Sequence, residues 1–221
     1  MRVLSWNIFH GRSVPDSPRD LLAEFACTLA GWDWDVALLQ ECPPWWPAPL
    51  ARACGAVEEH VMTSRNGGLA VRRAVAMRRP DLMRSNGGGC NAILVRRAGV
   101  DAHRAGRLCR LPERRWVHAV RLSSGAWLAN LHASGPDVAA RRDAQRAGAW
   151  LSGWAGTSPA LLAGDFNLAA PAVTGFALAG GHGVDGFVVA RWAVAGGLSV
   201  LDGGRLSDHR PVLLGLREPR H

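Results

Sequence analysis

Apolar and polar positions alternate with two different periods over the first 42 residues. Residues 2–8, RVLSWNI, alternate at every second position, as expected for a strand. Residues 18–31 place apolar side chains at helical spacing and end in glycine, and residues 35–42, DVALLQEC, form an apolar run of strand length. The pattern therefore predicts a β-α-β opening.

The second half of the chain continues this mixture of strands and helices. Residues 114–134 predict a hairpin that turns at Ser-Ser-Gly, residues 123–125. Residues 136–154 predict a helix, because alanine, leucine and tryptophan recur at helical spacing after a proline that suits the first turn. Three further apolar runs predict buried strands: 159–167, 183–190 and 210–216.

The middle of the chain is less regular. Residues 60–79 and 87–97 predict short strands separated by glycine turns. The glycine clusters are typical of loop tips rather than of a linker between domains, and no internal repeat occurs. A chain of 221 residues is long enough for one sizeable core, so we expect a single domain over residues 1–221.

Composition places the chain among globular proteins, with 48% hydrophobic and 20% charged residues. The net charge is +8, and all 26 basic residues are arginine. Arginine forks match phosphate geometry, but a complete absence of lysine is typical of codon bias, so the charge is a weak indication of a polyanionic partner. The sequence lacks a long apolar stretch and a charged leader, and its cysteines are scattered, so we expect a cytoplasmic protein with reduced thiols.

Polar side chains recur where the predicted strands end or begin. Each one alone has a simple explanation, such as a turn cap, a solvated carboxylate or a hydrogen-bonded core histidine. Together, their equivalent positions indicate a binding site, since functional groups are often carried where strands meet loops. These residues are Asn7, Glu41, His132, Asp165 with Asn167, Asp185, and Asp208 with His209.

The segments that carry these residues resemble the endonuclease/exonuclease/phosphatase superfamily. LLQE, GDFN and SDHRPV are specific when they occur in this order, and the matching segments extend from residue 4 to residue 212. The resemblance implies an α/β fold in which two packed mixed β-sheets are flanked by helices, a four-layer α/β sandwich. It also implies an active site at the edge where these strand ends converge.

The resemblance implies metal-assisted phosphoryl transfer. Glu41, with Asn7 and Asp208, would hold Mg²⁺ or Mn²⁺, because oxygen ligands of this kind suit these ions better than zinc. The ion would neutralise charge on the phosphoryl oxygen and on the leaving oxygen.

The catalytic roles follow from the same resemblance. Asp165 would orient the attacking water, and Asn167 would donate a hydrogen bond to the phosphate. Asp185 would orient His209, which would stabilise the developing charge or take a proton. His132 would donate to the phosphate or to the leaving group.

The sequence also departs from parts of the superfamily. Phe9 stands where abasic-site endonucleases have an acidic residue, and the chain contains no tyrosine. The carboxylate that pairs with the first histidine in deoxyribonuclease-like members has no clear counterpart, and Asn86 or Asn91 is the nearest candidate partner of His132. These departures leave the subfamily open.

Asn91 and two groups of residues could contact a substrate. Trp45 and Trp46 could stack on bases or meet a lipid interface, although most tryptophans are core residues. The arginine pairs could form a phosphate-tracking rim, with Arg96 and Arg97 foremost, or could be solvated surface. The pairs are Arg72-Arg73, Arg78-Arg79, Arg96-Arg97, Arg114-Arg115 and Arg141-Arg142.

The sequence therefore predicts a divalent-metal-dependent phosphodiesterase or nuclease that acts on nucleic acid. One alternative is a phospholipid or inositol-phosphate phosphoesterase, or an enzyme of another small phosphoester. A catalytically inactive phosphate-binding module is a remote alternative, because every central residue named above is present.

Overall fold

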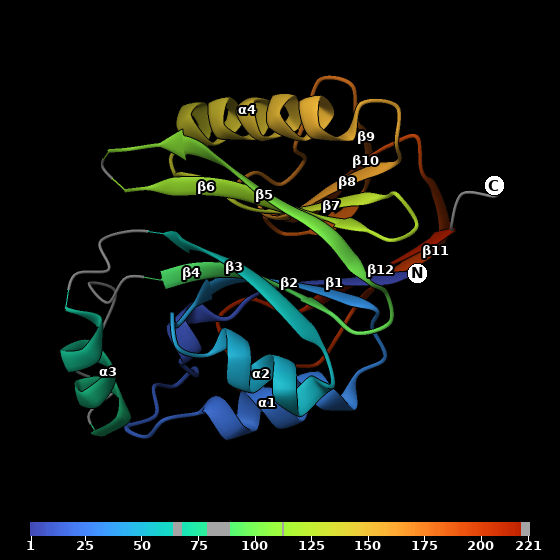
Figure 1. The fold of residues 1–221 in the computed structure, drawn as a ribbon. Coiled ribbons are helices and arrows are strands. Elements are labelled where there is room, and N and C mark those ends of the chain that lie inside the picture. The colour runs from blue at the N-terminus through green and yellow to red at the C-terminus, as the bar shows by residue number, and fades with distance from the viewer. Residues whose placement is uncertain (64–67, 79–88, 112, 218–221) are drawn as a thin grey trace.

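In the computed structural model, the described residues 1–63, 68–78, 89–111 and 113–217 form two six-stranded β-sheets that pack face to face (Figure 1). The first sheet contains, in spatial order, β11 (Ala193–Val200), β12 (Val212–Arg217), β1 (Arg2–Asn7), β2 (Val36–Cys42), β4 (Gly89–Val95) and β3 (Val57–Thr63). The second contains β5 (Val100–Cys109), β6 (Arg115–Leu122), β7 (Trp127–His132), β8 (Ala160–Asp165), β10 (Asp185–Ala190) and β9 (Ala177–His182).

Helices cover the outer faces of both sheets. The first sheet is covered by α1 (Leu22–Gly31) and α2 (Pro47–Cys54), and the second by α4 (Asp137–Ala155), as Figure 1 shows. A short 3₁₀ helix, η1 (Phe9–Gly11), follows β1, and α3 (Leu69–Arg78) follows β3. The four layers confirm the predicted fold class. None of the described helices is long and apolar enough to cross a membrane.

The apolar core has one layer between the two sheets and a further layer beneath the helices on each outer face. In β1, Leu4 and Trp6 pack toward α1 and α2, whereas Val3 packs toward the second sheet. Alanines of α4, among them Ala140 and Ala144, pack on the outer face of the second sheet. Central strands that are buried on both faces appear in sequence as nearly continuous apolar runs, which is why those runs predicted strands.

A polar bridge joins the two sheets. The Gln40 amide donates to the Asn130 side-chain oxygen at 2.9 Å, and Asn130 donates in turn to the carbonyls of Leu39 and Ala92, each at 2.9 Å. These side chains are buried, so their hydrogen bonds fix how β2 and β7 sit relative to each other. The bridge lies within two residues of the ends of both strands.

The predicted elements are mostly confirmed, with corrections in the middle of the chain. The hairpin forms β6 and β7, and the predicted helix over 136–154 is α4. Within residues 60–79, however, the structure has α3 rather than a second short strand, and α2 is a helix that the sequence pattern did not predict. The strands β9 and β11 are glycine-rich and largely exposed, so they lack the apolar alternation that would have revealed them.

Candidate active site

Strand register places the polar side chains at one edge of each sheet. In the first sheet, the parallel pairing of β1 with β2 places Asn7 and Glu41 at the same edge. In the second sheet, Asp165 of β8 is paired directly with His132 of β7 on one side and with Asp185 of β10 on the other. The site therefore lies where these two sheet edges meet.

Asp165 is the carboxylate at the centre of this edge, and it is almost completely buried. The Asn7 amide donates to its Oδ2 atom at 3.0 Å across the gap between the sheets. The Nε2 atoms of His132 and His209 lie 3.6 Å and 3.9 Å from the same oxygen. One carboxylate thus contacts groups from both sheets.

The turn after β8 holds Asp165 in place. The backbone N–H of Asn167 donates to Asp165 Oδ1 at 2.9 Å, and the Asn167 amide donates to the carbonyl of Ala133 at 2.9 Å. Asn167 adopts a left-handed backbone conformation with φ 51°. The side chain predicted to reach the phosphate therefore also ties the β8 turn to the end of β7.

Gly164 allows β8 to approach β7 closely at this point. Its φ is +139°, and a Cβ atom there would lie 1.9 Å from the carbonyl oxygen of Leu131. A residue with a side chain would have to push the strands apart just before Asp165. The first position of the GDFN segment therefore requires glycine, because no side chain fits between the two strands there.

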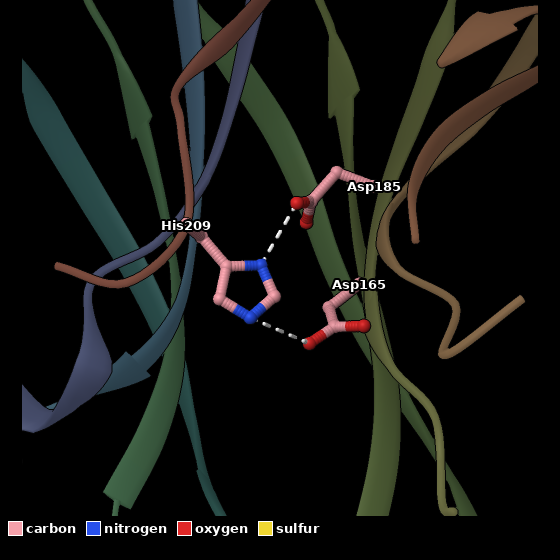
Figure 2. Close-up of side chains that lie close together, drawn as sticks. All are labelled: Asp165, Asp185 and His209. Carbon is pink, nitrogen blue, oxygen red and sulfur yellow. Dashed lines mark hydrogen bonds and ion pairs between the residues drawn. The ribbon is translucent and has the colours of Figure 1, made fainter. Parts of the chain in front are cut away.

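His209 and Asp185 form a hydrogen-bonded pair. His209 Nδ1 lies 2.8 Å from Asp185 Oδ2, and its Nε2 points toward Asp165 (Figure 2). Burial lowers the pKa of His209, but the hydrogen bond and charge of Asp185, with the charges of Asp165 and Asp208, raise it overall to about 9. Burial raises the pKa of Asp185, and its hydrogen bond to His209 opposes this change. We therefore treat His209 as an imidazolium at neutral pH.

The three side chains in Figure 2 could be considered a metal site, since ligand atoms of Asp165, Asp185 and His209 all lie within 4.8 Å of one another. A protonated imidazole has no free lone pair, however, and Nδ1 already donates to Asp185. The pair is therefore better suited to hydrogen-bond donation than to metal ligation.

The loop that carries His209 is fixed by hydrogen bonds to β1. The Ser207 hydroxyl donates to the Asn7 carbonyl at 2.6 Å and accepts the His209 backbone N–H at 3.1 Å. The Trp6 indole N–H donates to the His209 carbonyl at 3.0 Å. Asp208, between them, is exposed, and its negative charge helps to raise the pKa of His209. Its part as a third metal ligand beside Asn7 and Glu41 stays a prediction.

Glu41 carries the carboxylate at the edge of the first sheet. Its backbone has φ 51°, an uncommon conformation for a residue with a side chain, and such strain is often found at functional sites. Its Oε2 atom lies 3.1 Å from Nε2 of His10, and its Oε1 atom lies 3.8 Å from Nε2 of His132. The Asn7 side-chain oxygen accepts a hydrogen bond from the Phe9 N–H at 3.0 Å and keeps a second lone pair. Glu41 and Asn7 thus offer oxygen donors suited to a hard divalent cation.

His132 is held as a neutral imidazole. Burial lowers its pKa well below the ordinary histidine value, and the positive charge of Arg115 lowers it further. Nη1 of Arg115 lies 2.8 Å from His132 Nδ1, and a guanidinium can only donate. Nδ1 must therefore accept, so Nε2 carries the proton and can donate toward the site.

The observed partner of His132 differs from the expected one, and the site contains two residues that were not expected there. Asn91 is buried and donates to the Trp116 carbonyl at 3.5 Å rather than to His132, and Asn86 lies outside the described residues. Arg115 takes that place instead. Sequence reasoning missed His10, which lies three residues after Asn7, and considered Arg115 only as part of an arginine pair that could form a rim.

The two predicted tryptophans lie mainly in the core. Trp46 is only 3% exposed, and its ring lies 5.3 Å from that of Phe25. It also fills the space above Gly11, where a Cβ atom would meet its ring at 2.3 Å. Trp45 is half-buried against the same core. The structure does not bring Trp46 to the surface where a substrate could stack on it.

Arg96 and Arg97 lie at the wrong end of the sheet for a rim around this site. They follow β4, whose last residue is paired with Val36 at the start of β2, opposite the Glu41 end. Arg96 donates to the carbonyls of Trp32 and Cys54, and Arg97 forms ion pairs with Asp33 and Asp35. Both guanidiniums have structural partners there. Among the other arginine pairs, Arg79 lies outside the described residues.

Known proteins resemble this chain in sequence and in fold. Residues 4–209 match the model of the Endonuclease/Exonuclease/phosphatase family. A similar solved structure is the endonuclease/exonuclease/phosphatase from Beutenbergia cavernae DSM 12333, with 17% identity and a TM-score of 0.76 over 99% of this chain and 71% of that one. No curated protein matches this chain in sequence.

Two other similar structures carry more specific names. The mannosyl-6-phosphatase from Bacteroides thetaiotaomicron VPI-5482 has 16% identity and a TM-score of 0.71 over 98% of this chain and 99% of that one. TDP2 from Caenorhabditis elegans has 16% identity and a TM-score of 0.66 over 98% and 74% of the two chains. At these identities the likeness shows a shared fold. The chain belongs to the endonuclease/exonuclease/phosphatase family of phosphoester hydrolases.

Proposed function

We propose that this protein is a divalent-metal-dependent phosphodiester hydrolase that cleaves nucleic acid. The observation that carries the proposal is the set of contacts around Asp165. Its Oδ2 atom is approached by Asn7 at 3.0 Å, His132 at 3.6 Å and His209 at 3.9 Å, and these groups come from both sheets. Hydrogen-bond donors that converge on one buried carboxylate form a preorganised place for a phosphoryl group and an attacking water.

Each side chain then has a distinct part in the reaction. Asp165, held by Asn7 and by the Asn167 backbone, orients the attacking water and accepts its proton. His209, held by Asp185, donates through Nε2 to a phosphoryl oxygen as negative charge develops there. His132 donates through Nε2 to a second oxygen, because Arg115 fixes its tautomer.

Glu41 and Asn7 would hold the metal ion, Mg²⁺ or Mn²⁺. Their oxygen atoms fit such an ion, and Glu41 keeps an exposed fraction of 21%, so its carboxylate can be reached. When bound, the ion would supply charge neutralisation at the phosphoryl and leaving oxygens. The neighbouring imidazoles of His10 and His132 contact Glu41 in the structure and hold its carboxylate at the site edge.

We favour nucleic acid as the substrate because the guanidinium of Arg115 lies beside His132, and the net charge of +8 is a weaker indication in the same direction. A small phosphomonoester is the second candidate. It is supported by the similarity to the mannosyl-6-phosphatase, which extends over nearly the full length of both chains. A lipid substrate loses its main support, because Trp46 is buried.

The test is a comparison of substrates in Mg²⁺. End-labelled single-stranded and duplex DNA and RNA are incubated with the protein, in parallel with p-nitrophenyl phosphate and mannose 6-phosphate. We expect oligonucleotide cleavage that is lost in the His209→Ala variant. Release of phosphate from the monoesters, without cleavage of any oligonucleotide, would replace the nuclease proposal with the phosphatase.

A further inference from the structure

A cavity lined by arginines lies outside the site described above. It has a volume of about 350 Å³ and lies between the end of β5 and the first half of α4. In the described part of the chain, no carboxylate lies within ion-pair distance of its four guanidiniums, which belong to Arg107, Arg110, Arg142 and Arg146. Four like charges around one cavity repel each other, so the cavity favours a bound polyanion.

An exposed tryptophan continues this surface. A neighbouring cavity of about 400 Å³ shares Arg107 and Arg146 and adds Trp150, which is 46% exposed. The Trp150 ring lies against the backbone of Gly106, where a Cβ atom would meet it at 2.7 Å, and it stacks on Trp154 with a centroid distance of 5.7 Å. The partly exposed indole ring is therefore held rigidly beside the guanidiniums. We call the two cavities together the β5–α4 groove.

The β5–α4 groove lies close to the active site. Cys109, at the end of β5, is paired with Arg115 of β6, and Arg115 contacts His132 of β7. Two strand spacings, about 10 Å, therefore separate the end of β5 from the strand that carries His132. In Figure 1, α4 covers the outer face of the second sheet, and β5 is the edge strand of that sheet. A polymer with its reacting phosphate in the site can reach the groove within a few units.

We propose that the β5–α4 groove binds the single strand of nucleic acid next to the scissile phosphate. The guanidiniums contact backbone phosphates, and a base stacks on Trp150. This combination of a basic groove and an aromatic face is the arrangement by which proteins hold single strands. The inference rests on the proposed nuclease function and adds where the rest of the substrate lies.

The first test measures the salt dependence of binding. Binding of a fluorescein-labelled 12-nucleotide DNA to the His209→Ala variant is followed by anisotropy at several salt concentrations. Adding Arg110→Glu and Arg142→Glu should weaken binding and reduce the log-log salt slope by about 1.4, since each lost contact with a single strand contributes about 0.7. Arg142→Glu alone should reduce the slope by about 0.7.

Arg141→Glu is the matched control for Arg142→Glu. Arg141 is the preceding residue of α4, does not line the groove, and lies 3.8 Å from Asp137 in an exposed ion pair. The substitution makes the same change in net charge on the same helix. It should leave the salt slope close to that of the parent, so an equal effect of both substitutions would show that only overall charge matters and would overturn the inference.

A second test examines stacking. Trp150→Ala should lower affinity for the 12-mer about tenfold, and Trp150→Phe should retain most of it, because base stacking on an aromatic ring contributes substantially to each contact. A 12-mer of abasic sugar-phosphate has no base to stack, so the two variants should bind it equally. A similar loss for the abasic 12-mer would overturn the stacking contact.

The outcomes separate the groove from the nuclease proposal. If the parent binds the 12-mer with a steep salt slope that the Arg110→Glu, Arg142→Glu variant keeps, the groove inference is wrong and the nuclease proposal stands. If the parent binds no DNA or RNA but binds phosphatidylserine vesicles, and the double substitution abolishes that binding, both proposals fail together.

Discussion

At the scale of the residue, the proposed chemistry depends on the protonation of two histidines that share one carboxylate neighbour. His209 is held as an imidazolium by Asp185, whereas burial and Arg115 keep His132 neutral. Both Nε2 atoms point toward Asp165, so two different hydrogen-bond donors approach one acceptor. Local partners, rather than residue type, set these two states.

Removal of the His209 imidazole should therefore impair the chemical step. We expect His209→Ala to lower kcat for a phosphodiester about a hundred- to ten-thousandfold. Asp185→Asn should cost less, and the double variant should be no worse than His209→Ala, because the two side chains act as a unit. Steady-state kinetics of the four proteins measures this, and strictly additive losses would show that Asp185 and His209 work separately.

The raised pKa of His209 also predicts a pH dependence of stability. Its pKa is about 9 in the folded protein against an ordinary value of 6.5, so its contribution is fully present below pH 6.5 and is lost as the pH rises through about 9. In metal-free buffer, the thermal midpoint of the wild-type protein should fall between pH 6 and pH 9.5 by about 6–12 °C more than that of His209→Ala. Equal falls in both proteins, measured by circular dichroism, would exclude this linkage.

At the scale of the element, strand register alone brings several site residues together, without a contribution from any loop. His132, Asp165 and Asp185 are neighbours because β7, β8 and β10 are adjacent and end in register. Gly164 permits the close approach of β8 to β7 immediately before Asp165. The geometry of the site thus depends on strand packing as much as on its polar side chains.

Gly164→Ala tests this dependence. The added methyl group would lie 1.9 Å from the Leu131 carbonyl oxygen in a backbone conformation unfavourable for alanine, so we expect a loss of more than about 3 kcal/mol of unfolding free energy, measured in urea. Gly153→Ala is the control. Gly153 lies in α4 with nothing within 4 Å of its added methyl group, and the substitution should stabilise the protein by about 0.5–1 kcal/mol. Equal stability of the two variants would contradict the packing argument.

At the scale of the whole molecule, the sequence predicted the central strands and the residues at their ends. Buried strands such as β2 and β8 are continuous apolar runs that stop at a polar residue, so position along the chain indicated the site edge. The single-domain organisation over residues 1–221 stays a prediction.

Other features depend on contacts that the sequence pattern does not encode. Arg115 comes to His132 only through the pairing of β6 with β7, and His10 reaches Glu41 through an unusual backbone turn. Trp46 lies in a proline-rich segment and Arg96 in an arginine pair, but the fold directs both side chains to structural partners. Three-dimensional packing therefore determines which polar and aromatic residues lie at the site.

The most direct test of metal-dependent diester hydrolysis at this site is the hydrolysis of bis(p-nitrophenyl) phosphate by the wild-type protein and by Glu41→Gln. We expect hydrolysis in Mg²⁺ that chelator abolishes, and a loss of about a hundredfold in Glu41→Gln that excess Mn²⁺ partly restores. Thermal melting of both proteins serves as the control for folding. An undiminished rate in chelator, or a Glu41→Gln variant as active as the wild type, would contradict the account.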